Sequence, residues 1–260
     1  SAYWMSENGF FNYDGQLKSM PCLVEDFVYD SLNSVPRDLF NAGVNNLFGE
    51  INWFYCSANS NVVDRVVTYN YLDSSRERPI WTVGSLDRTA WQDSAVYDKP
   101  HATYFDATDN ASFDVTGNTD GSTIYYEHEI GTNQVDAGGA VTAIQANILS
   151  GDFDITQKRS NTGQAVGTPD LRGDGEYIMR ISRFIPDFID QTGTTKVSFT
   201  TRNYPNSTPV TTNFDITSST NFKSTRIRAR SIALKVSNTG TNEDWKLGTF
   251  RLDIAPGGMR

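Results

Sequence analysis

The sequence is poor in the residues that build most metal and redox sites. It has two cysteines and two histidines in 260 residues. These counts exclude a disulfide framework and a histidine-rich metal site. No apolar run approaches the roughly 20 residues that cross a bilayer, and no basic-then-apolar leader is present. The chain starts with Ser1 rather than Met, so we expect either processing or a piece of a longer protein.

The two cysteines, Cys22 and Cys56, are both flanked by apolar residues. Free cysteines are mostly buried in folded proteins. We therefore expect two unpaired, buried thiols. A reducing compartment such as the bacterial cytoplasm is consistent with this expectation.

The net charge of −9 is spread unevenly. Residues 1–170 hold 23 acidic and 9 basic residues, a net charge of −14, whereas residues 171–260 hold 8 acidic and 13 basic residues, a net charge of +5. A mainly acidic body argues against a general nucleic-acid-binding protein, which usually has a basic face. It remains compatible with an acidic channel through which DNA slides.

The hydrophobic pattern indicates an all-β chain with one or two short helices near the N-terminus. Residues 3–20 are expected to form a hairpin, residues 24–32 a helix, and residues 34–40 a second short helix that ends at Gly43. Short alternating runs bounded by Asp, Ser, Asn and Gly predict strands elsewhere. They cover residues 50–55, 64–71, 79–84, 88–91, 124–130, 141–149, 153–155, 177–184, 196–202, 214–216, 225–236 and 245–254.

The spacing of these runs suggests two parts with a boundary near residue 128. Residues 1–128 are expected to form a partial β-propeller-like region, and residues 129–260 a β-sandwich domain. By the usual four strands per blade, the first part offers about two blades. The rest of a closed propeller is expected upstream of Ser1.

The most informative polar feature is a row of arginines, Arg226, Arg228 and Arg230. Strand alternation puts all three on one face, with Ile227 and Ala229 facing inward. Such rows bind phosphate or an acidic partner, so this face is our candidate subunit or phosphate contact. The alternative is an exposed strand face that keeps the sheet soluble and prevents edge pairing.

The carboxylates and histidines offer weaker candidates. Asp152 and Asp154 are two residues apart and would share one face of a strand. Glycosidases use two carboxyl groups that flank the bond to be cleaved. A half-exposed strand gives the same alternation without any chemistry. His101 and His128 build no common site with their neighbours. We therefore expect no catalytic residues, no cofactor and no enzymatic activity.

Residues 116–127 have part of the spacing of a calcium-binding EF-hand loop. Asn118, Asp120 and Gly121 would occupy loop positions 3, 5 and 6, and Glu127 position 12. Position 1 is Thr116, which lacks the required carboxylate, and a strand pattern follows instead of a helix. A polar hairpin loop is therefore expected, with no metal.

Several aromatic motifs, taken in their order, resemble the tail hub or nozzle proteins of podoviruses, the short-tailed bacteriophages. The motifs are WMSENGFFNYDG (4–15), GEINWFY (49–55), YNY (69–71), WTVG (81–84), RTAWQD (88–93), SGDFDI (150–155), RFIPDF (183–188), RNYP (202–205) and WKLGTFRLD (245–253). The resemblance covers nearly the whole chain. It implies a propeller with β-sandwich parts and no catalytic residue.

The resemblance also implies a function. Copies of the chain would form a homo-oligomeric ring below the portal and adaptor, contact fibres or spikes, retain packaged double-stranded DNA and let it out at infection. The protein would be assembled in the bacterial cytoplasm and found in the virion tail. A receptor- or glycan-binding tail module is the alternative, favoured if Trp81, Trp91 or Tyr97 gather in an exposed groove. A polysaccharide-degrading enzyme is a third reading.

Overall fold

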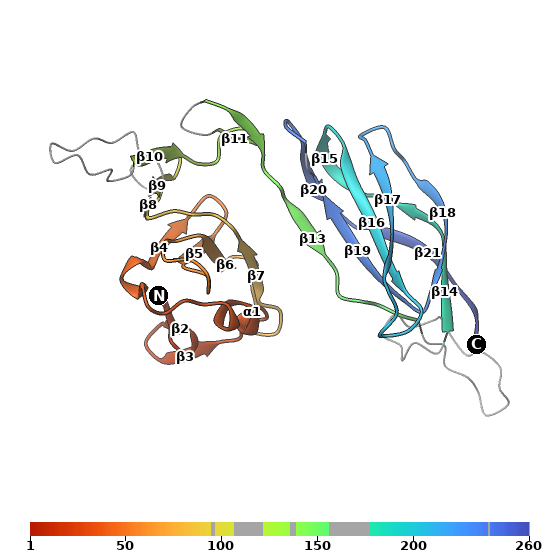
Figure 1. Cartoon of the computed structure of the whole chain (residues 1–260), viewed down its shortest axis with the longest axis horizontal. Coiled ribbons are helices and arrows are strands. Elements are labelled where there is room, and N and C mark those ends of the chain that lie inside the picture. Colours follow the sequence, from red (N-terminus) through yellow and green to blue (C-terminus); the bar gives the residue numbers. More distant parts are fainter. Residues whose placement is uncertain (95–96, 107–121, 136–138, 156–176, 239, 260) are drawn as a thin grey trace. The chain divides into compact units, whose positions relative to one another are not determined.

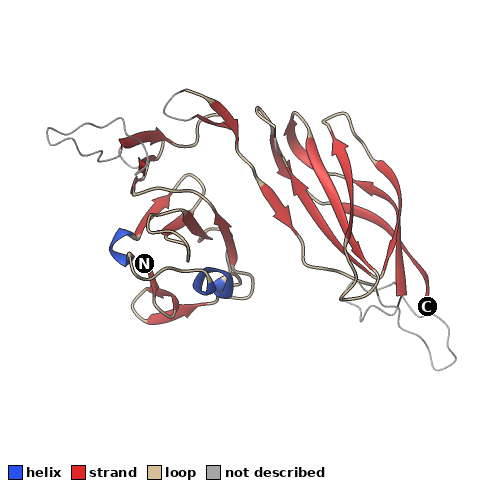
Figure 2. Cartoon of the chain, in the orientation of Figure 1, coloured by secondary structure: helices blue, strands red, loops and turns tan. Residues whose placement is uncertain are grey.

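The computed structural model describes residues 1–94, 97–106, 122–135, 139–155, 177–238 and 240–259. Figure 2 shows that strands dominate these residues, so the chain is mostly β, as the sequence predicts. The chain separates into two compact units, Ser1–Ile130 and Gly131–Arg260. The division falls close to the expected position, and each unit is described by itself below.

The first unit opens with an antiparallel three-stranded sheet rather than a simple hairpin (Figure 1). Its strands are β1 (Ala2–Ser6), β2 (Gly9–Tyr13) and β3 (Leu17–Met20). Alternation along β2 buries the Phe10 ring completely, because successive strand side chains point to opposite faces. Phe10 packs against Trp81 and Trp53, with ring centroids 4.7 and 5.1 Å away.

Helix α1 (Glu25–Asp30) follows, shorter than expected, and its acidic first turn precedes the buried Val28. The second expected helix is a single 3₁₀ turn, Arg37–Leu39. The prediction that this helix ends at Gly43 is wrong, because Gly43 lies in strand β4 (Asn41–Asn45). There the indole of Trp91 occupies the space that a Cβ on Gly43 would fill.

A four-stranded antiparallel meander forms the centre of the first unit. It consists of β4, β5 (Glu50–Tyr55), β6 (Arg65–Asn70) and β7 (Ile80–Gly84). All but the first residue of β5 are buried, because both faces of the sheet are covered. Trp53 belongs to a core cluster with Phe10 and Trp81, whereas Phe54 packs on the other face with Cys56 and Val66.

A third antiparallel sheet completes the first unit. Its strands are β8 (Ala90–Gln92), β9 (His101–Asp106) and β10 (Ser122–Glu127). The strand expected over residues 124–130 therefore ends at Glu127. Residues 116–121 of the segment 116–127, where a polar hairpin loop is expected, lie outside the described residues; Glu127 is exposed on β10.

The described residues of the second unit form four sheets, whose strands can be followed in Figure 1. Two of them are two-stranded: β11 (Asn133–Val135) with β12 (Val141–Ala143), and β15 (Phe188–Thr192) with β20 (Asp244–Leu247). A four-stranded sheet has the order β13 (Asn147–Leu149), β19 (Ser231–Ser237), β16 (Thr195–Arg202), β17 (Val210–Ile216). A three-stranded sheet has the order β18 (Lys223–Ala229), β14 (Tyr177–Ile185), β21 (Arg251–Met259).

One hydrophobic core joins the two larger sheets of the second unit. Phe184 of β14 is completely buried, and its ring lies 5.3 Å from Phe199 of β16 and 5.2 Å from Phe214 of β17. Inward residues from both sheets thus share one apolar cluster, which holds the two sheets together by excluding water.

Three predicted strands of the second unit are divided, and a fourth forms only an isolated bridge. Residues 225–236 form two strands, β18 and β19, that belong to different sheets, with Arg230 between them. Residues 245–254 are divided into β20 and β21 around Gly248, whose amide donates to the carbonyl of Asp187 at 2.7 Å. Residues 153–155 contribute only one bridge, between Phe153 and Ile232.

Residues 141–149 are likewise divided, into β12 and β13.

None of the helices within the described residues has the length and apolar character needed to cross a membrane.

Candidate functional site

The arginine row is divided by the end of strand β18. Arg226 and Arg228 are exposed, whereas Ile227 and Ala229, which alternate with them, are buried. The expectation that Arg230 continues this face is wrong, because β18 ends at Ala229. The chain then crosses to the other large sheet, and Arg230 lies in that corner.

A further arginine joins Arg226 and Arg228 on the outer face. Arg180 of β14 is exposed and lies directly opposite Arg228 in the strand register. Like charges at opposed positions destabilise a strand pair by a few tenths to about 1 kcal/mol. Among the described residues none forms an ion pair with Arg180, Arg226 or Arg228. We call these three residues the arginine face.

Arg183 borders the arginine face and is already neutralised. Its Nε lies 2.6 Å from Asp253 Oδ2, and its guanidinium lies 5.6 Å from the Phe222 ring centroid. Arg180 was not predicted from the sequence, although its alternation with the buried Met179 and Ile181 is the signal of an outward-facing strand residue. Which strand it would lie beside could not be known without the pairing.

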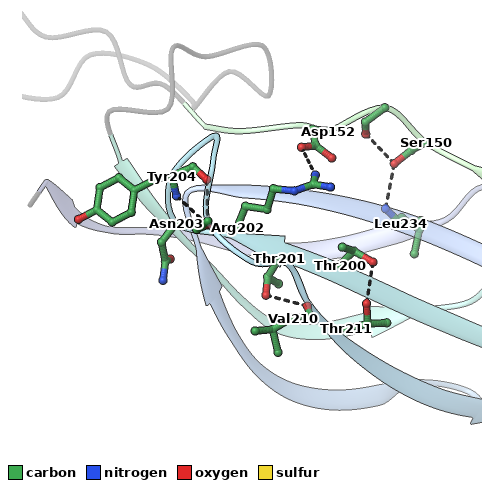
Figure 3. A network of polar contacts seen from close by, with 12 residues as sticks. Ser150, Asp152, Thr200, Thr201, Arg202, Asn203, Tyr204, Val210, Thr211 and Leu234 are labelled. Carbon is green, nitrogen blue, oxygen red and sulfur yellow. Dashed lines mark hydrogen bonds and ion pairs between the residues drawn. The ribbon is translucent and has the colours of Figure 1, made fainter.

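Asp152 and Asp154 come together at one pocket in the second unit. This pocket has a volume of about 660 Å³, and its lining includes Arg202, Asn203, Tyr204 and Arg230 as well as both carboxylates. We call it the Tyr204 pocket. Figure 3 shows Arg202 extending toward Asp152; the two side chains are 2.5 Å apart.

Backbone hydrogen bonds hold the three segments that form the Tyr204 pocket. Phe153 and Ile232 exchange two such bonds, of 2.9 and 3.0 Å, and the amide of Arg230 donates to the carbonyl of Arg202 at 3.2 Å. The Ser150 hydroxyl accepts a hydrogen bond from the Leu234 amide at 2.9 Å, also drawn in Figure 3. The pocket therefore rests on sheet pairing rather than on side chains alone.

The tryptophans that would have marked a glycan groove do not form one. Trp81 is buried in the core of the first unit. Trp91 packs on Phe54 with ring centroids 5.7 Å apart, and its indole nitrogen donates to the carbonyl of Val44 at 2.8 Å. Tyr97 is exposed, but its ring packs on His101 instead.

The two histidines have separate surroundings in the first unit. His101 stacks with the Tyr125 ring. His128 accepts a hydrogen bond at Nε2 from the Nε of Arg88, 2.9 Å away. Burial, together with the charge of Arg88, lowers the pKa of His128 to about 4. A neutral imidazole held in this way supports the fold, because its Nε2 is already engaged by the hydrogen bond from Arg88.

Arg88 is itself buried, with 5% of its surface exposed. Its guanidinium contacts the Asp87 carboxylate at 3.0 Å and lies 4.2 Å from the centre of the Tyr126 ring. Burial lowers the pKa of Arg88 and raises that of Asp87. We interpret this cluster as structural, because Nε and Nη1 of Arg88 both donate to partners within the unit.

Both cysteines are unpaired, as the sequence predicts. The expectation of a buried thiol is confirmed for Cys56 and wrong for Cys22, which is half-buried beside the core of the first unit. Burial raises the pKa of both thiols, that of Cys22 to about 11. Across the part of the chain that the structure describes, no group of three or more His, Cys, Asp or Glu side chains is arranged to hold a metal ion.

A second, larger hollow of about 950 Å³ lies in the first unit. It is bordered by β1, by the turn after β1 and by the start of β4, and its lining includes Trp4, Tyr29 and Asn41. The first strands of two successive sheets therefore border one open space.

Comparison with models of known protein families finds no match to this sequence, and comparison with curated proteins finds none either.

Proposed function

We propose that this chain is a non-enzymatic structural subunit of a phage tail, part of the hub or nozzle through which DNA leaves. The order of its aromatic motifs suggests the family, and one structural observation supports the corresponding architecture. The first unit consists of three successive antiparallel meanders, whose first strands are β1, β4 and β8.

These three first strands gather within the unit, as the inner strands of propeller blades do. Strands β4 and β8 lie against each other, joined by the Trp91 indole over Gly43 and its hydrogen bond to Val44. Strands β1 and β4 border the 950 Å³ hollow. Three sheets are fewer than the roughly four to eight blades of a propeller, so the remaining blades would come from another part of the protein or from another copy.

In this proposal the second unit is a β-sandwich, whose two larger sheets enclose the core around Phe184. Its outer arginine face would contact a neighbouring copy in the ring. The first 130 residues carry 19 acidic and 7 basic residues, a net charge of −12, so a head-to-tail contact between copies has charge complementarity. Such heterologous contacts close into rings when the rotation divides the circle.

The arginine face can be tested with charge reversals. Arg226→Glu with Arg228→Glu is compared with Arg76→Glu and Arg78→Glu, which make the same change of net charge at two exposed residues of the first unit. We expect the first pair to slow ring formation in low salt, measured by light scattering and mass photometry. Salt near 0.5 M should slow the wild type similarly, because it shortens the screening length below about 10 Å.

Two outcomes would contradict the assembly proposal. A wild-type protein that stays monomeric at all concentrations and salt conditions has no ring to form. Equal assembly rates for the two double variants would show that the arginine face is not the contact, leaving a phosphate-facing role to be tested by DNA release.

The propeller proposal predicts unpaired sheet edges in the first unit. Residues 1–128 expressed alone should be insoluble or unfolded, because exposed strand edges pair with other chains, whereas 129–260 should fold. A monomeric 1–128 fragment that melts cooperatively would count against it.

The absence of enzymatic activity is also a proposal. Asp152 is tied to Arg202 in an ion pair, which suits a positioning role better than chemistry on a glycosidic bond. Release of reducing ends from host surface polysaccharide, abolished by Asp154→Asn, would overturn it.

A further inference from the structure

The Tyr204 pocket combines features that the proposed tail architecture does not use. Tyr204 is 67% exposed although it is a large aromatic residue. Its position is nevertheless restrained, since the Ser207 hydroxyl donates to the Tyr204 carbonyl at 2.8 Å and accepts from its amide at 3.3 Å. A ring held at the rim of a pocket provides a flat apolar surface for a ligand.

The charged groups around this ring balance each other. Asp152 is paired with Arg202, while Asp154 is half-buried and has no ion-pair partner among the described residues. The Arg230 guanidinium lies 6.0 Å from the centre of the Tyr204 ring. Among the described residues that line the pocket, two carboxylates and two guanidiniums have formal charges that sum to zero.

This balance restricts the ligand class. A phosphate or sulfate would meet two carboxylates, and a divalent cation would meet two guanidiniums, so each would be repelled by half of the charged side chains described in the lining. An uncharged ligand rich in hydroxyl groups avoids both penalties. Its hydroxyls can donate to the carboxylates and accept from the guanidiniums and the Asn203 amide.

We propose that the Tyr204 pocket binds a neutral hexose within an oligosaccharide. The C–H groups on one face of a pyranose would pack on the Tyr204 ring, whose face is electron-rich. The hydroxyls on the sugar's edge would bond to Asp154 and to the Asp152–Arg202 pair. The volume of about 660 Å³ lies in the range of roughly 300–1,000 Å³ of small-molecule sites.

The sheets already place the polar groups, so binding requires little ordering of the backbone. Arg202 and Ser231 are partners across β16 and β19, and residues 150–153 are hydrogen-bonded to β19. A preformed site loses less affinity to conformational entropy than a loop that must order itself. This inference is independent of ring assembly, because the arginine face lies on the other large sheet.

The test uses the full chain and three neutral disaccharides, lactose, maltose and cellobiose, with glucuronic acid as a charged probe. Saturation-transfer NMR reports which sugar contacts the protein, and titration gives the affinity. We expect at least one neutral disaccharide to bind, and glucuronic acid to bind at least tenfold more weakly.

Tyr204→Ala and Asp154→Asn should each weaken the binding of that disaccharide at least tenfold. Tyr13→Ala serves as the matched control, because Tyr13 is a similarly exposed tyrosine, at 51%, in the first unit. All three variants should keep the wild-type melting temperature, since Tyr204 and Tyr13 are exposed and asparagine has the same shape as the half-buried Asp154 side chain. Wild-type affinity in Tyr204→Ala would overturn the proposal. So would the absence of binding by all three neutral disaccharides, or tighter binding of glucuronic acid.

Discussion

Arg88 donates from Nε to the Nε2 of His128 across 2.9 Å, which requires that this nitrogen of the imidazole carries no proton. A cation that is 95% buried thus holds a histidine neutral, with the proton placed on Nδ1. The pairing couples the stability of the first unit to pH.

Acidification should destabilise the first unit through His128. Burial and Arg88 lower the pKa of His128 from 6.5 to about 4, so between these values the unfolded chain binds a proton that the folded chain does not. The free energy of unfolding therefore falls as pH drops from about 6.5 to about 4, by about 1–2 kcal/mol after allowance for screening. Urea unfolding at several pH values measures the slope.

His128→Gln isolates this contribution from the carboxylates that titrate in the same range. The variant should lose less stability than the wild type between pH 7 and pH 4.5. Identical slopes for the two proteins would show that His128 is protonated in the folded state.

Removal of the Arg88 guanidinium should lower the free energy of unfolding more than removal of an exposed guanidinium. Arg88→Met leaves the half-buried Asp87 without its cation, and breaking such a pair costs about 3–5 kcal/mol. The free energy of unfolding of Arg88→Lys should lie between those of the wild type and Arg88→Met, because a lysine keeps the charge but cannot reproduce the planar contacts to Asp87 and Tyr126. The control is Arg65→Met, whose side chain is 44% exposed, with an expected loss under about 1 kcal/mol.

The two thiols should react slowly in the folded protein. Because burial raises the pKa of Cys22 to about 11 and also raises that of Cys56, little thiolate is present at pH 8, and the thiolate is the nucleophile. Iodoacetamide should modify both cysteines quickly in urea and slowly without it. A native mass lower by two hydrogens would reveal a bridge and contradict this.

Phe184→Ala should destabilise the second unit by about 3–5 kcal/mol, because it opens a cavity among packed rings. The neighbouring ring centroids of Phe199, Phe214 and Phe250 lie within 5.2–5.5 Å. Calorimetry of residues 131–260 should show a lowered melting temperature. Phe222→Ala, which removes a ring that is 53% exposed, should change the melting temperature little. Equal shifts in melting temperature for the two variants would show that the packing of Phe184 is not what stabilises the unit.

Strongly patterned strands could be predicted from the sequence because their burial is periodic or continuous. β5, which is covered on both faces, has the uninterrupted apolar run that predicts a strand. β4 could not be predicted, since its Asn-Ala-Gly-Val-Asn sequence has no such pattern. It is a strand because β5 supplies its hydrogen bonds and Trp91 covers Gly43.

The candidate sites were predictable only where their residues are close in sequence. The alternation of Arg226 and Arg228 with Ile227 and Ala229 indicated an outer face, and this placement is confirmed. Arg180 joins that face through strand pairing, which periodicity within β14 cannot reveal. The Tyr204 pocket likewise needs three segments of the chain. Arg230 lines this pocket because the chain turns at that residue between β18 and β19, and the turn has no distinct sequence pattern.

The fit of the Trp91 indole over Gly43 has an evolutionary consequence. A lineage could enlarge residue 43 only after residue 91 had become smaller, because the two occupy one space. Chains descended from a common ancestor with this one should therefore show glycine at the first position wherever the second is tryptophan. Such a covarying pair would align β4 with β8 in distant relatives, even where the rest of the sequence has diverged.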